Sequence, residues 1–115
     1  MANTFKVITK AGVTSADVIY TVAGSTTTII LGLIIGNTTS GAITSSVTLG
    51  TDTANRAGAN NESNQDVELV TSAAIPANSS LELLGGNKIV METTDTLTVT
   101  GSGAVDVALS VMEIT

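Results

Sequence analysis

The fold class of this chain is decided by one segment, Val105-Asp106-Val107-Ala108-Leu109-Ser110-Val111-Met112-Glu113-Ile114. Its large apolar residues occupy every second position from Val105 to Val111, and Asp106, Ala108 and Ser110 stand between them. Side chains of a β-strand point alternately to its two faces, so this spacing predicts a strand with one buried face.

The same alternation recurs along the rest of the chain. Leu97 and Val99 alternate with threonines, whose branched side chains suit an exposed sheet face, and no window of eleven or more residues carries a comparable helical stripe. Turn-forming residues, such as those of Pro76–Ser79 and Gly101–Gly103, interrupt the apolar runs. They divide the chain into about eight strands, with cores expected near Phe5–Ile8, Asp17–Val22, Thr28–Ile35, Ile43–Leu49, Val67–Thr71, Leu81–Leu84, Ile89–Glu92, Thr96–Thr100 and Val105–Ile114.

These elements predict an all-β fold, a single-domain β-sandwich of about eight antiparallel strands over residues 1–115. A length of 115 residues suits one domain. Both a jelly-roll and an immunoglobulin-like strand order use about eight short strands, so the sequence leaves the two open.

The amino-acid composition excludes most kinds of catalytic and metal-binding site. The chain has no cysteine and no histidine, which removes thiol nucleophiles, zinc ribbons and the commonest general base. A net charge of −6 would repel phosphate backbones, so no nucleic-acid partner is expected. Glu92 and Asp95 are the acidic residues that most resemble a catalytic pair of carboxylates. The favoured interpretation is that they form a tight turn. We therefore expect no enzyme activity, no catalytic residues, no cofactor, no metal and no small-molecule substrate.

The segment Ile29–Ile35 is apolar on both faces. Strict alternation places Ile29, Leu31, Leu33 and Ile35 on one face, and Ile30 and Ile34 on the other. A strand in a two-layer sandwich lacks cover on its outer face, so Ile30 and Ile34 are predicted to contact a partner subunit. A loop folded across the strand is the equal alternative. Seven residues are too few to cross a membrane, and no membrane partner is expected.

Two further segments bear on partners. Thr51–Gln65 is a long polar stretch with Arg56, the chain's single arginine, near its centre. Arginine suits pairing with a carboxylate, so Arg56 is a candidate interface residue, although a solvated hairpin tip is favoured. Strand Val105–Ile114 could extend a neighbour's sheet or bury Met112 and Ile114 at an interface. The alternative is that it lies at the centre of its own sheet.

Several segments resemble small virion structural proteins of tailed bacteriophages, particularly marine and cyanobacterial ones. They cover nearly the whole chain: Met1–Lys6, Val18–Val22 followed by Thr26–Asn37, Ile75–Glu82, Gly86–Val90 and Leu109–Thr115. The resemblance implies a β-sandwich present in many copies on the particle, as a capsid decoration (cement) protein or a neck or tail component. It implies the major capsid protein or other virion proteins as partners, a homo-oligomer, and location in the virion after assembly in the host cytoplasm.

Capsid decoration is therefore the leading expectation for function. A host-receptor or carbohydrate-binding module using loop 51–65 is the second, weakened by the presence of only two aromatic residues, Phe5 and Tyr20. A small hydrolase using Glu92 and Asp95 is a distant third.

Overall fold

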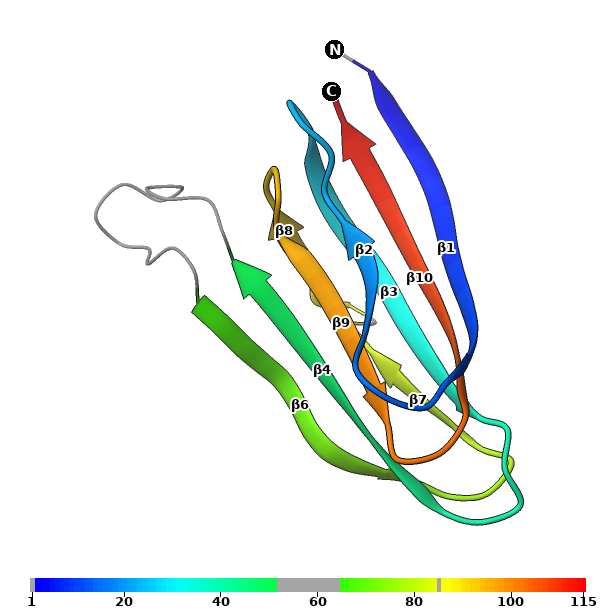
Figure 1. The fold of residues 1–115 in the computed structure, drawn as a ribbon. Coiled ribbons are helices and arrows are strands. Elements are labelled where there is room, and N and C mark those ends of the chain that lie inside the picture. Colours follow the sequence, from blue (N-terminus) through cyan, green and yellow to red (C-terminus); the bar gives the residue numbers. More distant parts are fainter. Residues whose placement is uncertain (1, 52–64, 85) are drawn as a thin grey trace.

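The computed structural model describes residues 2–51, 65–84 and 86–115 as two stacked β-sheets (Figure 1). The described residues contain no helix and form nine strands. These are β1 (Asn3–Val13), β2 (Asp17–Thr21), β3 (Thr27–Asn37), β4 (Ile43–Thr51), β6 (Gln65–Ile75), β7 (Ser80–Leu83), β8 (Ile89–Met91), β9 (Thr96–Gly101) and β10 (Val105–Ile114). The predicted all-β sandwich is confirmed, and each predicted strand core corresponds to one of these strands.

The strand order follows a nested pattern. One sheet has the order β1-β10-β3-β7, with β8 also paired to β3, and the other has the order β2-β9-β4-β6. Every pair is antiparallel: β1 with β10, β10 with β3, β3 with β7 and β8, β2 with β9, β9 with β4, and β4 with β6. The first strand of the chain thus pairs with the last, the second with the next to last, and so on toward the middle of the chain. These nested pairs alternate between the two sheets. This arrangement is a jelly roll, which resolves the topology that the sequence left open.

The core lies between the two sheets and follows the predicted alternation. Val105, Val107, Leu109 and Val111 of β10 are all buried, as are Leu97 and Val99 of β9. The threonines that flank Leu97 and Val99 are half-buried on the outer side of their sheet. The remaining large core side chains come from the other strands and their ends, and they include Tyr20, Ile30, Leu33, Ile35, Val47, Ile75 and Met91.

Strict alternation fails in β3, because the ladder with β10 is irregular there. Gly32 pairs with Ser110 and Ile30 pairs with Val111, so Leu31 is left without a partner across the ladder. An extra residue of this kind shifts the inward and outward phase of the strand. Ile30, Leu33 and Ile35 are consequently all in the core, while Ile34 is 47% exposed on the outer face. The prediction that Ile30 shares the outer face with Ile34 is wrong, and a fully buried Ile30 cannot line an outer interface.

The position of β10 corrects a second expectation. It lies between β1 and β3 in Figure 1 and pairs with both along its length, so it cannot extend a neighbour's sheet. The alternative, that it is an inner strand of its own sheet, is confirmed. The strand at that edge of the sheet is β1, and its ladder with β10 is extended by paired backbone hydrogen bonds between Ala2 and Thr115.

A polar network joins the two sheets at one end of the core. The hydroxyl of Tyr20 on β2 lies 2.7 Å from Oγ1 of Thr28 on β3, and it donates a 2.5 Å hydrogen bond to Oε2 of Glu113 on β10. The other oxygen of Glu113 forms a 2.7 Å ion pair with Lys6 on β1. Burial, followed by the hydrogen bond to Glu113, raises the pKa of Tyr20 to about 12. Lys6, followed by Tyr20, lowers the pKa of Glu113.

Candidate interaction surface

The outer face of the sheet formed by β1, β10, β3 and β8 carries a continuous row of apolar side chains. The register places Phe5 opposite Met112, Met112 opposite Ile29, and Ile29 opposite Val90. Residues directly opposite each other in an antiparallel pair project from the same face of the sheet. These four residues, called the apolar row below, therefore cross four adjacent strands side by side.

This row is accessible to a partner. Phe5 is 70% exposed and Val90 is 54% exposed at its two ends, while Met112 and Ile29 between them are half-buried. Val7, two residues along β1 on the same face, is 63% exposed. Single exposed apolar residues are ordinary on protein surfaces, whereas apolar side chains gathered into one large patch are typical of a contact site.

Beyond the apolar row, the same face is hollowed. In the next outward-facing row along the strands, Val7 lies opposite Ser110, which lies opposite Gly32. This central row is followed by a third one, the groove row, in which Thr9, Ala108, Ile34 and Glu82 lie opposite one another in turn. Small side chains therefore replace large ones across the middle strands of the face, and the surface sinks there.

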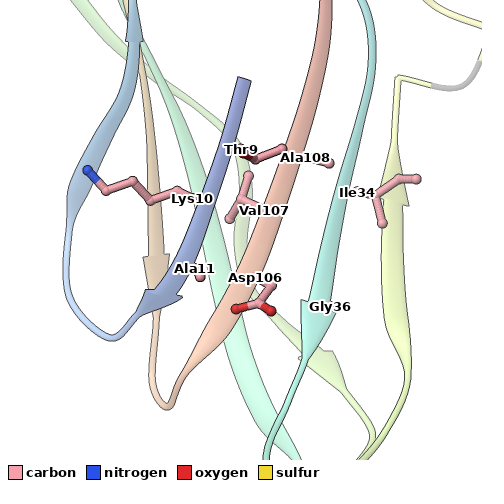
Figure 2. Close-up of a pocket in the computed structure, with 8 residues that line it drawn as sticks. All are labelled: Thr9, Lys10, Ala11, Ile34, Gly36, Asp106, Val107 and Ala108. Carbon is pink, nitrogen blue, oxygen red and sulfur yellow. The ribbon is translucent and has the colours of Figure 1, made fainter. Parts of the chain in front are cut away.

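A cavity of about 420 Å³ occupies this sunken region (Figure 2). It is lined by residues of three strands, namely Thr9, Lys10 and Ala11 of β1, Asp106, Val107 and Ala108 of β10, and Ile34 and Gly36 of β3. A second cavity of about 200 Å³ shares Ile34 and Ala108 with the first and adds Gly32 and Ser110. The two cavities therefore lie next to each other on the outer face.

Charged groups lie at the margins of this face. Among the outer-face positions of β1, β10 and β3, none carries a charge between the apolar row and the groove row. Asp106 lies beyond the groove row, where its Oδ1 accepts a 3.0 Å hydrogen bond from the backbone N–H of Gly12. Lys10 extends away from Ile34 in Figure 2 and forms a 3.4 Å ion pair with Asp17 on β2. The central row of the face is therefore uncharged, whereas Lys10 and Asp106 line the larger cavity beside the groove row.

The structure brings part of the predicted interface together. Ile34 and Met112 both lie on this outer face, and Ile114 lies there too, opposite Asn3 on β1 and Thr27 on β3. Ile30 is in the core, as described above. Arg56 and the other residues of 52–64 lie outside the described residues.

Sequence reasoning missed Phe5, Val7, Ile29 and Val90. The alternation of Phe5 and Val7 with Lys6 and Ile8 is visible in the sequence, and it predicts that the two share a face. That Phe5 lies beside Met112 depends on pairing the first strand with the last, which alternation alone does not reveal.

The carboxylates that could have served catalysis belong to a turn instead. The backbone N–H of Asp95 donates to the carbonyl of Glu92 at 3.0 Å, and Oδ2 of Asp95 accepts a 2.9 Å hydrogen bond from the backbone N–H of Glu92. Asp95 is fully buried. The predicted tight turn is confirmed.

Within residues 2–51, 65–84 and 86–115, no three acidic side chains come together in a way that could hold a metal ion. The same residues include no helix of the length and hydrophobicity that a membrane span requires.

Comparison with known proteins gives a distant structural likeness. No protein-family model matches this chain, and no curated protein matches it. Among solved structures, a chain from Bacillus endospore appendages, described as a novel family of disulfide-linked pili, is 16% identical to it. The match covers 97% of this chain and 84% of that chain, with a TM-score of 0.49. Similarity at this level carries no argument about function.

Proposed function

We propose that this protein is a structural subunit of a virus particle, and specifically a decoration protein that stabilises the head shell of a tailed bacteriophage. In this role it works through contacts with copies of itself and with the major capsid protein or other virion proteins, and it has no catalytic function. Its location is the assembled virion.

The observation that carries the proposal is the apolar row on the outer sheet face. Phe5 and Val90 are more than half exposed at the ends of the row, and Val7 is equally open beside it. Burial of apolar surface is the main driving force of protein association, at roughly 25 cal/mol for each Å² removed from water. A protein whose most accessible large apolar side chains gather on one sheet face is suited to a subunit contact.

The fold supports the same role by analogy. Jelly rolls with two antiparallel sheets are a recurrent architecture of viral capsid proteins, although the fold also serves lectins and enzymes. The sequence resemblance to small virion proteins of tailed phages adds to this analogy. The acidic chain, with a net charge of −6, would also be repelled by packaged nucleic acid.

The presence of many copies on one particle explains how the small contact area of a single subunit would suffice for stable attachment. A chain of 115 residues makes only limited contacts with one neighbour. On a symmetric shell, each subunit is held by several neighbours at once, and linked weak contacts raise the overall avidity by orders of magnitude.

The experiment is to locate the chain on purified phage particles by electron cryomicroscopy and mass spectrometry. A decoration protein is expected as density repeated over the head in multiples of the lattice symmetry. A single ring at the neck or tail would reject decoration and leave the structural class intact. Absence of the chain from particles of a phage that expresses it would overturn the proposal.

An add-back assay tests the surface itself. Particles that lack the chain are incubated with purified wild type, Val7→Asp or Val18→Asp, and bound protein is measured after sedimentation. Val18 lies on β2 of the other sheet and is 49% exposed, so it is a matched control for Val7. We expect binding to fall at least tenfold for Val7→Asp and to stay within twofold of wild type for Val18→Asp.

A further inference from the structure

We infer that the outer face of the sheet β1-β10-β3 is covered by a second copy of this chain, related by a two-fold axis that passes over Val7. The inference deepens the proposed function and rests on it in one respect, namely that the chain acts by binding subunits. It names the occupant of the face and the register of the contact.

The register of the sheet sets the position of the axis. Along β1, Phe5 of the apolar row and Thr9 of the groove row lie at equal distances on either side of Val7. A two-fold axis that lies in the plane of the interface, perpendicular to the strands and over the central row, exchanges these two rows between copies. The apolar row of each copy then lies over the groove row of the other, which makes the contact isologous.

The shapes of the two rows match under this exchange. Phe5 projects from the face with 70% of its surface exposed, and its partner position is the cavity of about 420 Å³ next to Thr9 and Ala11. Met112 of one copy lies over Ala108 of the other, and Ile29 lies over Ile34. Large side chains meet small ones on β1 and β10, and apolar side chains meet on β3, so both copies fill their hollows at once. At the outer end of the rows, Val90 of β8 lies over Glu82 of β7.

The area of the face fits a dimer. The strands β1, β10 and β3 have 10 or 11 residues each, and the short strands β7 and β8 share the fourth position. At ~3.3 Å per residue and ~4.8 Å between neighbours, they give a face of roughly 600 Å² before side-chain relief is counted. A specific interface of standard size buries ~800 Å² on each partner. The outer face of this sheet is therefore of the size that one copy of a specific dimer buries.

The charges permit two acidic copies to meet here. Each chain carries a net charge of −6, so most faces of two copies would repel each other. The rows between Phe5 and Thr9 on β1, β10 and β3 are uncharged. Asp106 lies on the far side of the groove row, and the rotation places it over Ile114 of the other copy, between Asn3 and Thr27 and away from that copy's Asp106. Like charges are thus kept apart.

Cross-linking tests the axis directly, because the chain has no native cysteine. Val7→Cys places one thiol beside the axis, and a short bis-maleimide reagent should then convert most of the protein to a covalent dimer. Val18→Cys, with a similarly exposed thiol on the other sheet, should give at least tenfold less dimer at the same concentration. Equal cross-linking of the two variants would overturn the inference.

The mass of the unmodified protein in solution gives the second readout, with circular dichroism to confirm that each variant keeps its β-structure. Wild type and Val18→Asp should have twice the mass of an 11.5 kDa monomer, whereas Val7→Asp and Ile34→Asp should be monomeric. A monomeric wild type at 0.1 mM, or a folded Ile34→Asp that remains dimeric, would contradict the inference. The second outcome would assign the contact to the open edge of β1, because Ile34 lies on β3, two strands away from that edge.

The two proposals fail separately. A dimer with this register in a protein absent from phage particles would reject the virion role and keep the interface. A protein that is found on the phage head but is monomeric when purified would reject the interface and keep the virion role.

Discussion

The hydroxyl of Tyr20 on β2 donates a 2.5 Å hydrogen bond to the carboxylate of Glu113 on β10, which joins the two sheets across the core. Tyr20 also contacts Thr28 on β3 and Glu113 also pairs with Lys6 on β1, so four strands meet in this network. Buried polar groups are costly when they lose a partner, because their desolvation is no longer offset. The network therefore both aligns the sheets and makes the protein sensitive to pH at either extreme.

Tyr20 should titrate far above the ordinary range for a tyrosine. It is the only tyrosine of the chain, so phenolate absorbance reports this residue alone. Its pKa is raised from 10.0 to about 12, because burial and the neighbouring Glu113 disfavour the phenolate. We expect a midpoint near 12 in buffer and near 10 in denaturant. Stability should therefore decline as pH rises from about 10 towards 12. Equal midpoints in the two solvents would contradict this.

Glu113 should contribute to unfolding in acid. Lys6 and Tyr20 lower its pKa from 4.5 in the folded protein, so the unfolded chain takes up the proton at a higher pH than the folded protein does. The free energy of unfolding should consequently fall as pH decreases from about 4.5 through the lowered pKa. Urea denaturation at pH 7 and pH 3 measures this loss.

Glu113→Gln should reduce the difference in stability between the two pH values. Asp66→Asn removes one negative charge from an exposed position of the other sheet and serves as the control, with the difference close to that of wild type. A wild-type difference retained in Glu113→Gln would show that other groups cause the acid sensitivity.

Asn37, at the end of β3, holds two chain reversals together. Its Nδ2 donates to the carbonyls of Gly41 at 2.9 Å, Ile75 at 3.0 Å and Pro76 at 3.1 Å, while Oδ1 accepts from the N–H of Thr39 at 2.9 Å. The residue is buried. We expect Asn37→Ala to cost about 2–3 kcal/mol of unfolding free energy, because the buried carbonyl of Ile75 and three partly buried backbone groups lose their partner.

Asn37→Asp should cost more than Asn37→Ala, because it places carboxylate oxygens against these carbonyls. Asn87→Asp, at an exposed position, should change the unfolding free energy by less than about 0.5 kcal/mol. Urea denaturation of the four proteins measures the differences. An Asn37→Asp protein as stable as wild type would show that these hydrogen bonds are not formed.

Gly101, at the end of β9, should not tolerate a side chain. A Cβ atom built there would lie 2.5 Å from the carbonyl oxygen of Gly103 and 2.9 Å from that of Val13, and both are backbone atoms that cannot move aside cheaply. Gly101→Ala should therefore lower the free energy of unfolding by about 2 kcal/mol or more. Gly24→Ala meets nothing within 4 Å and should remain near wild type in thermal unfolding. Equal melting temperatures would contradict the close approach.

The fold was largely predictable from the sequence because each strand carries its own signal. Alternation from Val105 to Val111 identifies one face of β10, and all four of its large apolar residues are in the core. Turn chemistry at Pro76–Ser79 is borne out by the 3.2 Å hydrogen bond from the N–H of Ser79 to the carbonyl of Pro76. Both signals are local and need no knowledge of which strands pair.

The candidate surface was predictable only in part, because it depends on pairing and on one irregularity. The unpaired Leu31 shifts the phase of β3, so Ile29 replaces Ile30 on the outer face. Phe5 and Met112 are near opposite ends of the chain and become neighbours only when β1 pairs with β10. Long-range pairing of this kind leaves no mark on local periodicity.

The central claim is that another subunit covers the outer face of the sheet β1-β10-β3-β8 in the working assembly. Hydroxyl-radical footprinting of the assembled and the dilute, isolated protein measures this at two reactive side chains of the apolar row, Phe5 and Met112. We predict that oxidation of both falls several-fold on assembly, whereas Met91, which is fully buried in the core, stays unreactive in both states. Unchanged oxidation of Phe5 and Met112 on assembly would contradict the claim.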